Sequence, residues 1–300
     1  MRHAPLPTLS WQPSTMNDVY TPTRRANKVA DWLEITALAK GVSLGSDALH
    51  EMGQGFGFKA ADVDLGLTTM GRRSALLGRA YPFATGAGIA AKADAWRCAW
   101  TAMLLMSPES PTRSSIDLTE AAGYLERITA EALKSLYGPG TSAIRFAWPS
   151  EDGRPPEFPD AVRWLAQLMS VPVGTAYRPP YAKDGGVDVV AWRSFPDGRS
   201  GFPVLLAQVT LEKDYVHKAA DVDVRVWAGW LALDHDPSTA LAIPDVVATG
   251  EDWNSLAART VVLDRIRLSS LIEASDPDHN GLSSVATWTK SQIASILEPM

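Results

Sequence analysis

The sequence predicts an α/β protein in which a mostly helical first part, residues 1–147, precedes an α/β domain with a central mixed sheet, residues 148–300. Three observations lead to this prediction. Apolar residues recur at helical spacing through most of the first part. A polar segment rich in proline and glycine, residues 148–156, then marks a linker. After it come a helical segment, two β-rich runs joined by a turn, and alternating helical and strand-like segments, which is an α/β pattern.

The first part is expected to hold four helices. Apolar residues at helical spacing predict the first over residues 24–40, and Gly41 is a suitable residue to end it. The same periodicity predicts helices over residues 62–79, 92–106 and 117–137. These helices carry no signature of DNA reading, so the expected role of the first part is oligomerisation, contact with a partner or sensing of a target.

The second part is expected to begin with a helix over residues 158–169, whose apolar residues follow helical spacing. Two β-rich runs follow, residues 186–193 and 202–211, and the polar segment between them has the proline, aspartate and glycine of a turn. The remaining predicted elements are, in order, a helical stretch at 215–233, a short apolar run at 241–248, a strand at 261–263 and a helix at 264–272.

Composition describes an ordinary globular chain. Of its 300 residues, 46% are hydrophobic and 21% are charged. A chain of this size can bury a hydrophobic core large enough to fold without disulfide bonds or structural metal ions. The single cysteine, Cys98, excludes an internal disulfide framework and a cysteine-based metal cluster. No apolar stretch approaches the roughly 18–20 residues of a membrane span, and the N-terminus lacks the apolar run of a secretory signal. A cytoplasmic protein without membrane contact is therefore expected.

Two oxygen-bearing side chains interrupt the two β-rich runs. Asp188 lies in the first run and Gln208 in the second. Because side chains alternate between the faces of a strand, Asp188 shares a face with Val190, and Gln208 shares one with Thr210. Two adjacent strands can bring both oxygens to one point. Such a cluster suits a hard divalent cation such as Mg²⁺, which binds one or two carboxylates together with carbonyls and waters.

The motif Asp-Gly-Gly-Val-Asp, which ends at Asp188, and the motif Ala-Gln-Val-Thr, which contains Gln208, carry a family resemblance. They resemble the PD-(D/E)xK nuclease superfamily, and within it the bacterial restriction and phage-defence proteins that have glutamine in place of glutamate. The likeness covers residues 157–218, about a fifth of the chain. It implies a restriction-endonuclease-like domain and a nuclease, dependent on Mg²⁺ or Mn²⁺, that hydrolyses DNA in defence against phage or other foreign DNA.

The family pattern has an acid on a preceding helix, an aspartate on the second strand, and Glu or Gln, any residue, and Lys on the third. In this chain Thr210 stands where the lysine is expected. Since lysine migration is known in the superfamily, Lys213 is the expected replacement, orienting or deprotonating the attacking water. Either Asp160 or Glu157 is expected as the helix acid, although acids at a helix start also complement the macrodipole. The expected metal ligands are Asp188, Gln208 and, through its carbonyl, Val209.

The net charge of −6 means that a nucleic-acid contact needs a local basic surface. The basic residues nearest the motif are Lys213, Lys218 and Arg225. They are expected to form a patch that faces phosphates, the alternative being that they are scattered, solvated charges. Expected partners are DNA, a protein of the same defence system and further copies of this chain. If Thr210 disables the site, the same fold is a catalytically degenerate subunit that binds nucleic acid or a partner protein. A third interpretation is an interaction module in which both motif residues are incidental.

Overall fold

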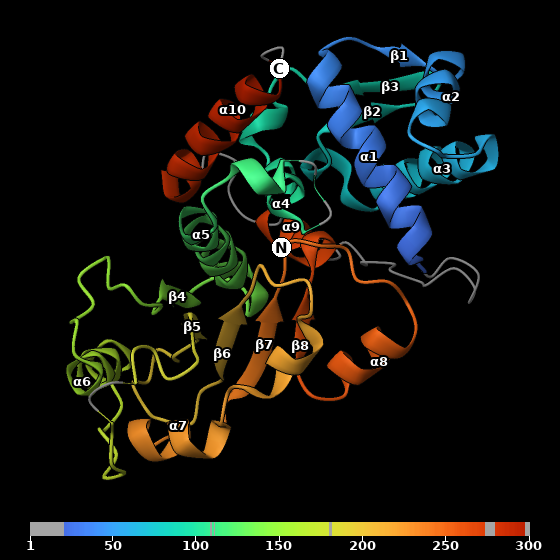
Figure 1. The fold of residues 1–300 in the computed structure, drawn as a ribbon. Coiled ribbons are helices and arrows are strands. Elements are labelled where there is room, and N and C mark those ends of the chain that lie inside the picture. Colours follow the sequence, from blue (N-terminus) through green and yellow to red (C-terminus); the bar gives the residue numbers. More distant parts are fainter. Residues whose placement is uncertain (1–20, 109, 111, 180–181, 274–279, 298–300) are drawn as a thin grey trace, which may run out of the picture.

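The computed structural model describes residues 21–108, 110, 112–179, 182–273 and 280–297. They form a mixed α/β structure in which a five-stranded sheet with helices on both faces lies beside a mainly helical part (Figure 1). The predicted fold class, α/β with a central mixed sheet, is confirmed at this level. Within the described part of the chain, no helix combines the length and the apolar character that a membrane crossing requires.

The central sheet has the strand order β4-β5-β6-β7-β8. Its strands are β4 (Ser142–Arg145), β5 (Val189–Trp192), β6 (Val204–Val209), β7 (Ser238–Ala242) and β8 (Val261–Leu263). β5 runs antiparallel to β4 and to β6, whereas β6, β7 and β8 run parallel to one another. Strands β4, β6, β7 and β8 therefore end at the edge where β5 begins, and we call this edge the carboxyl edge.

Helices cover both faces of the sheet, namely α5 (Leu118–Leu136) on one and α6 (Phe158–Met169) with α7 (Val224–Leu231) on the other. Side chains of the strands alternate between the two layers. Val189 and Ala207 pack on the α5 side, whereas Val190 and Leu206 pack on the side of α6 and α7. Because both faces are buried, the strands read in the sequence as nearly continuous apolar runs.

Local sequence explains where α5 begins and where α6 ends. The Asp117 side chain caps α5 by accepting hydrogen bonds from the backbone N–H groups of Thr119 and Glu120 at 2.8 and 3.2 Å. Helix α6 ends at Ser170, whose left-handed backbone, with a φ of 56°, lets its N–H bond back to the carbonyl of Ala166. Both helices lie where apolar periodicity predicts them.

The mainly helical part consists of α1 (Arg24–Lys40), α2 (Ser46–Gly55), α3 (Ala60–Leu77) and α4 (Ala99–Met106). A small antiparallel sheet in the order β1-β3-β2 belongs to it, with β1 (Leu44–Gly45), β2 (Phe83–Thr85) and β3 (Gly88–Ala91). Three helices follow later in the chain, and they are α8 (Glu251–Ala257), α9 (Arg265–Glu273) and α10 (Ser283–Leu297). Because α9 and α10 both contact α4, the described end of the chain packs on its first part.

The first and second parts share elements across residue 148. Strand β4 precedes that position yet lies in the same sheet as β5, and α5 packs on this sheet. Arg265 at the start of α9 donates to both carboxylate oxygens of Asp31 in α1, at 3.1 and 2.9 Å. The expected boundary at residue 148 thus falls between two neighbouring strands of one sheet.

The structure agrees with some predictions of single elements and differs from others. Helix α1 spans the predicted residues and ends at Gly41, which has a φ of 64°. The helix predictions over residues 92–98 and 215–223 are wrong, because these residues form turns and the short 3-10 segments Ala95–Arg97 and Val216–Ala220. Strand β4, helices α2, α8 and α10 and the small sheet were not predicted. Short strands such as β4 carry too few residues for a periodic signal.

A glycine fixes the contact between α7 and the loop after α6. The N–H of Gly174 donates to the carbonyl of Trp230 at 2.8 Å. A Cβ atom built on Gly174 would lie 1.8 Å from the carbonyl oxygen of Gly229, so the Gly174→Ala change must displace backbone. We expect urea denaturation to show a loss of about 1–3 kcal/mol in the free energy of unfolding. Gly55→Ala is the matched control, because its Cβ meets nothing within 4 Å, and equal stability of the two variants would contradict the prediction.

Candidate functional site

The candidate site lies at the carboxyl edge, where β5 begins and β6 ends. Val189 of β5 pairs with Ala207 of β6, so the next positions outward are Asp188 and Gln208. The strands that carry the two motif residues are therefore neighbours, as predicted. The N–H of Asp188 donates to the carbonyl of Ala207 at 2.9 Å, and its carboxylate accepts from the N–H of Val209 at 2.7 Å. The carboxylate of Asp188 is thus held against the end of β6.

The end of β4 holds Asp188 from the other side. The carbonyl of Asp188 accepts from the N–H groups of Phe146 and Ala147, at 2.6 and 3.0 Å. Two residues after β4 thus oppose one residue before β5, which is the pattern of a β-bulge. The carboxylate of Asp184 accepts from the N–H of Gly186 at 2.9 Å and so fixes the turn that leads into β5. Asp188 is therefore tied to both neighbouring strands.

The carboxyl group of Asp188 has a strongly shifted pKa. Burial raises the pKa of Asp188 to about 7. The N–H of Val209 acts against burial, whereas the neighbouring carboxylates of Glu126 and Asp184 act with it. A carboxyl group with such a pKa exchanges its proton near neutral pH, which is typical of functional sites. A cation bound beside it would favour the ionised form.

Glu126 of α5 lies in the electrostatic neighbourhood of Asp188, and sequence reasoning missed it. Nε of Arg145 donates to Oε2 of Glu126 at 2.5 Å, and both residues are buried. Burial raises the pKa of Glu126 to about 7, although Arg145 lowers it. Its signal in the sequence is an acid on the apolar face of a helix, one turn before Ala130 and two turns before Leu133.

The side chain of Gln208 has an unsatisfied acceptor. Its Nε2 donates to Oδ2 of Asp221 at 3.2 Å. Its Oε1 is buried and has no hydrogen-bond partner among the residues that the structure describes. A buried acceptor without a partner costs about 1–3 kcal/mol. A cation or an N–H donor at this position would satisfy the oxygen.

Lys218 is the basic residue that the structure brings near Gln208. Its Nζ lies 3.7 Å from Oδ2 of Asp221, the same oxygen that accepts from Gln208. The ammonium group also lies 3.2 Å from Oε1 of Glu212. The hydrogen bond to Glu212 raises the pKa of Lys218, and the charge of Asp221 adds to this effect. Lys218 is therefore a cation at neutral pH.

Lys213 and Thr210 have other surroundings. Lys213 lines a separate cavity of about 410 Å³ together with Arg24 and Asp245, and neither motif residue belongs to the lining of that cavity. Thr210 is buried, and its hydroxyl oxygen accepts from the N–H of Glu212 at 3.1 Å. The structure thus gives Thr210 a role in shaping the segment after β6.

The predicted helix acids and Arg225 lie on the side of α6 and α7. Asp160 forms an ion pair with Arg163 on the exposed surface of α6. Glu157 occupies the N-cap position of α6 without a side-chain cap, and Arg225 is exposed at the start of α7. Across the described ranges, none of the three predicted residues forms a hydrogen bond or ion pair with Asp188.

The donors at the carboxyl edge fit a cation that keeps several waters. In the described ranges, no three side chains of His, Cys, Asp or Glu lie close enough together to hold a metal ion. The donor set is the carboxylate of Asp188, the unsatisfied amide oxygen of Gln208 and backbone carbonyls such as that of Val209. Mg²⁺ is commonly bound through one or two carboxylates and retains water, so this oxygen set suits it. A structural zinc ion, which takes four nitrogen and sulfur ligands, does not fit.

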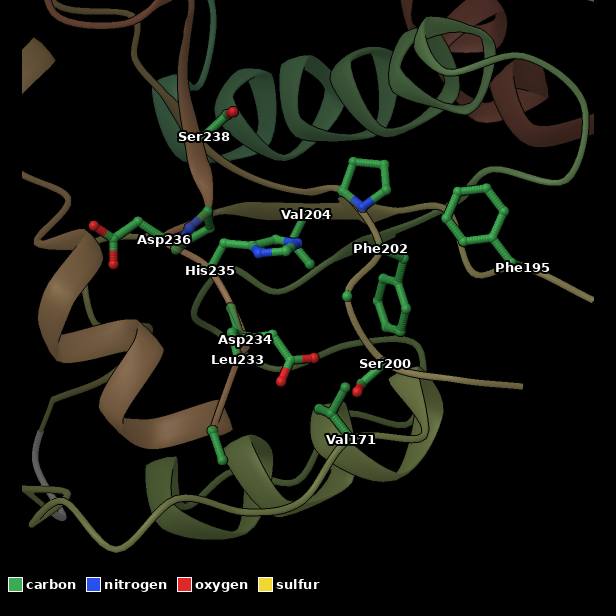
Figure 2. Close-up of a pocket in the computed structure, with 14 residues that line it drawn as sticks. Val171, Phe195, Ser200, Phe202, Val204, Leu233, Asp234, His235, Asp236 and Ser238 are labelled. Carbon is green, nitrogen blue, oxygen red and sulfur yellow. The ribbon is translucent and has the colours of Figure 1, made fainter. Parts of the chain in front are cut away.

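Another cavity, of about 340 Å³, lies at the opposite edge of the sheet, where β6 and β7 begin. Figure 2 shows Phe202, Asp234 and His235 among the side chains that line it. Asp234 and His235 are exposed, and neither side chain makes a hydrogen bond or ion pair with another described residue. This cavity lacks the ordered, partly buried donors of the carboxyl edge, which is therefore the better candidate.

The chain was compared with protein-family models, with curated proteins and with solved structures. No family model matches it, and no curated protein or solved structure does so.

Proposed function

We propose that this protein is a divalent-metal-dependent nuclease that hydrolyses phosphodiester bonds of DNA. The observation that carries the proposal is the pair formed by Asp188 and Gln208. A partly buried carboxyl group with a raised pKa lies opposite a buried amide oxygen that has no partner among the described residues. Both features are unfavourable in a purely structural role, and a bound cation would relieve both.

The order of the elements supports the proposal. The family pattern has an acid on a preceding helix, an aspartate on the second strand, and Glu or Gln, any residue, and Lys on the third. Here α5 with Glu126 precedes β4, Asp188 directly precedes β5, and Gln208 lies in β6. We therefore assign the role of the helix acid to Glu126 in place of Asp160 or Glu157.

The residues of the site would have distinct roles in the hydrolysis. A bound divalent metal supplies neutralisation of phosphate charge and a more acidic water. Asp188, the amide oxygen of Gln208 and the carbonyl of Val209 would hold it. Lys218 stays protonated at neutral pH, so it would neutralise phosphate charge and would not serve as the general base.

Cleavage of plasmid and single-stranded DNA with Mg²⁺ or Mn²⁺ tests the proposal. We expect the wild-type protein to cleave at least one of these substrates, and we expect Asp188→Ala and Gln208→Ala to lower the rate of that cleavage by at least about a hundredfold, because metal catalysis contributes several kcal/mol. Asp47→Ala, which removes an exposed acid from α2, is the matched control. If Asp188→Ala cleaves as fast as this control, the proposed site is wrong.

The two lysines provide a second test of the site. Lys218→Ala is expected to lower the cleavage rate more than Lys213→Ala does, because Lys218 shares the carboxylate of Asp221 with Gln208. The rates are compared at equal metal concentration, after thermal unfolding has shown that both variants fold. A lower cleavage rate for Lys213→Ala than for Lys218→Ala would contradict this prediction and would support Lys213 in the role that the sequence suggests.

A catalytically degenerate subunit is the second candidate function. The observation that favours it is Thr210, which occupies the motif lysine position and hydrogen-bonds locally to Glu212. Binding of DNA without cleavage at any metal concentration would support this alternative. In either case the resemblance suggests a role in defence against phage or other foreign DNA, and phage plating on cells with and without the gene would test that role.

A further inference from the structure

Trp148 is an exposed residue that follows the end of β4 at the carboxyl edge. It is 42% exposed, whereas Trp100, Trp227 and Trp230 are buried in the core. Among the described residues, no aromatic ring stacks on Trp148. The chain therefore leaves part of a large aromatic residue exposed to solvent, although these three tryptophans show that it can bury such a ring.

The backbone of Trp148 is tied to the segment that carries Asp188. The N–H of Ala147 donates to the carbonyl of Asp188 at 3.0 Å, and the N–H of Trp148 donates to Oδ2 of Asp184 at 3.4 Å. These bonds place the backbone of Trp148 one residue after the N–H group of Ala147 that contacts Asp188. A nucleic acid bound through a metal ion at Asp188 would thus pass close to the segment that carries Trp148.

The following residues hold the backbone of Trp148 from the other side. Nη1 of Arg145 donates to the carbonyl of Pro149 at 2.9 Å. Nη1 of Arg154 donates to Oγ of Ser150 at 2.6 Å, and the Arg154 guanidinium lies 4.5 Å from the centre of the Phe146 ring. The backbone that carries the indole is thus held in place, so little backbone conformational entropy is lost when a ligand stacks on the ring.

The charge around Trp148 disfavours a continuous duplex. The carboxylates of Glu151 and Asp152 form ion pairs with Arg127, at 2.6 and 3.4 Å, and the carboxylate of Asp184 accepts from the N–H of Trp148. The surface beside Trp148 therefore carries both signs of charge and is not a continuous basic surface, and the chain as a whole has a net charge of −6. Duplex DNA carries about one negative charge per 1.7 Å of its length, so it requires a basic surface. A single strand can instead offer a base face, and stacking on an aromatic side chain contributes about 1–3 kcal/mol per base.

We infer that Trp148 stacks an unpaired base beside the candidate site, so that the nucleic acid bound there is single-stranded. Paired bases inside a duplex have both faces covered by their neighbours and cannot offer one to the indole. Stacking does not depend on which base is present, so binding would show little sequence preference. This inference rests on the proposed function, because it requires that the carboxyl edge receive DNA.

Fluorescence anisotropy with labelled DNA in EDTA, where no cleavage occurs, tests the inference. The probes are a single strand of about 15 nucleotides, near the upper end of the range of about 4–16 nucleotides for single-strand binding sites, and the corresponding duplex. We expect the wild type to bind the single strand at least about tenfold more tightly than the duplex. Trp148→Ala is expected to lose about 5- to 100-fold in single-strand affinity, and Trp148→Phe to retain most of it, because a phenyl ring also stacks.

The control is Phe56→Ala, which removes another exposed aromatic side chain, 72% exposed at the end of α2. Equal single-strand affinity of Trp148→Ala and this control would overturn the inference while leaving the proposed nuclease intact. Tighter binding of the duplex by the wild type would overturn the assignment to single strands. Failure of the wild type to bind or cleave either probe with metal present would overturn the proposed function and the inference together.

Discussion

Replacing Arg73 by methionine is expected to lower the free energy of unfolding by about 3–5 kcal/mol, the cost of breaking a buried ion pair. Arg73 is fully buried in α3 and donates from Nη1 to Asp31 at 2.7 Å and to Glu34 at 2.6 Å. Its removal would leave two carboxylates of α1 in the core with Arg265 as the remaining cation among the described residues that face them.

The surroundings of Arg73 explain why the loss should be large. Oε1 of Glu34 also accepts from the hydroxyl of Tyr81 at 2.7 Å, and its Oε2 accepts from Nε1 of Trp100 at 2.8 Å. Burial raises the pKa of Glu34, whereas the two arginines outweigh burial and hold the pKa of Asp31 below its ordinary value. The buried network of Asp31, Glu34, Arg73 and Arg265 therefore depends on both arginines to stabilise the carboxylates in the core.

Urea denaturation of Arg73→Met and Arg72→Met would check this prediction. Arg72 is the adjacent residue of α3 and is exposed, so its replacement removes the same charge without disturbing the core. We expect a change within about 0.5 kcal/mol for the control, as is usual for surface substitutions. If the two variants are equally stable, the buried network does not hold α1, α3 and α9 together.

The stability of the wild type is expected to fall as pH rises from about 4 to 8, and Asp188→Asn should remove much of this fall. Burial raises the pKa of Asp188 from 3.8 to about 7. Between these values the folded state binds a proton that the unfolded state has lost, so the free energy of unfolding decreases with pH. A shift of about three units corresponds to up to about 4 kcal/mol for Asp188, and Glu126, whose pKa is also raised to about 7, adds to the fall.

Thermal unfolding at pH 5 and pH 8 measures this effect. Asp188→Asn should be more stable than the wild type at pH 8 and nearly equal to it at pH 5, because asparagine keeps the shape without the charge. Mg²⁺ should stabilise the wild type at pH 8 and should stabilise the variant less, which is a readout of metal binding that does not depend on activity. Asp197→Asn, at an exposed turn, is the control. Identical pH profiles for wild type and Asp188→Asn would contradict the prediction.

Helices α1 and α6 could be predicted from the sequence because their signals are local. Their apolar residues repeat at helical spacing, and Gly41 ends α1 in the left-handed conformation that glycine adopts readily. The pairing of β5 with β6 was also predictable from two apolar runs joined by a turn. Strand β4 was not, because its neighbour in the sheet, β5, lies far along the chain.

The candidate site was predictable only in part. Asp188 and Gln208 stand out because each is a polar residue inside an apolar run. Glu126 is marked only by its place on the apolar face of α5, a helix that carries other acids, and Lys218 could not be selected because the segment after β6 carries two lysines. Only the path of that segment brings Lys218 near Asp221 and leaves Lys213 in another cavity.

By itself, the sequence determined the α/β class, the pair of apolar strands joined by a turn and the presence of one carboxylate and one amide among apolar neighbours. These properties depend on side-chain periodicity and on the cost of burying polar groups, which act over a few residues. The tertiary structure decided which acid, which lysine and which exposed tryptophan share the carboxyl edge with Asp188. That choice depends on how elements distant in the chain pack against the sheet, and no local pattern encodes such distances.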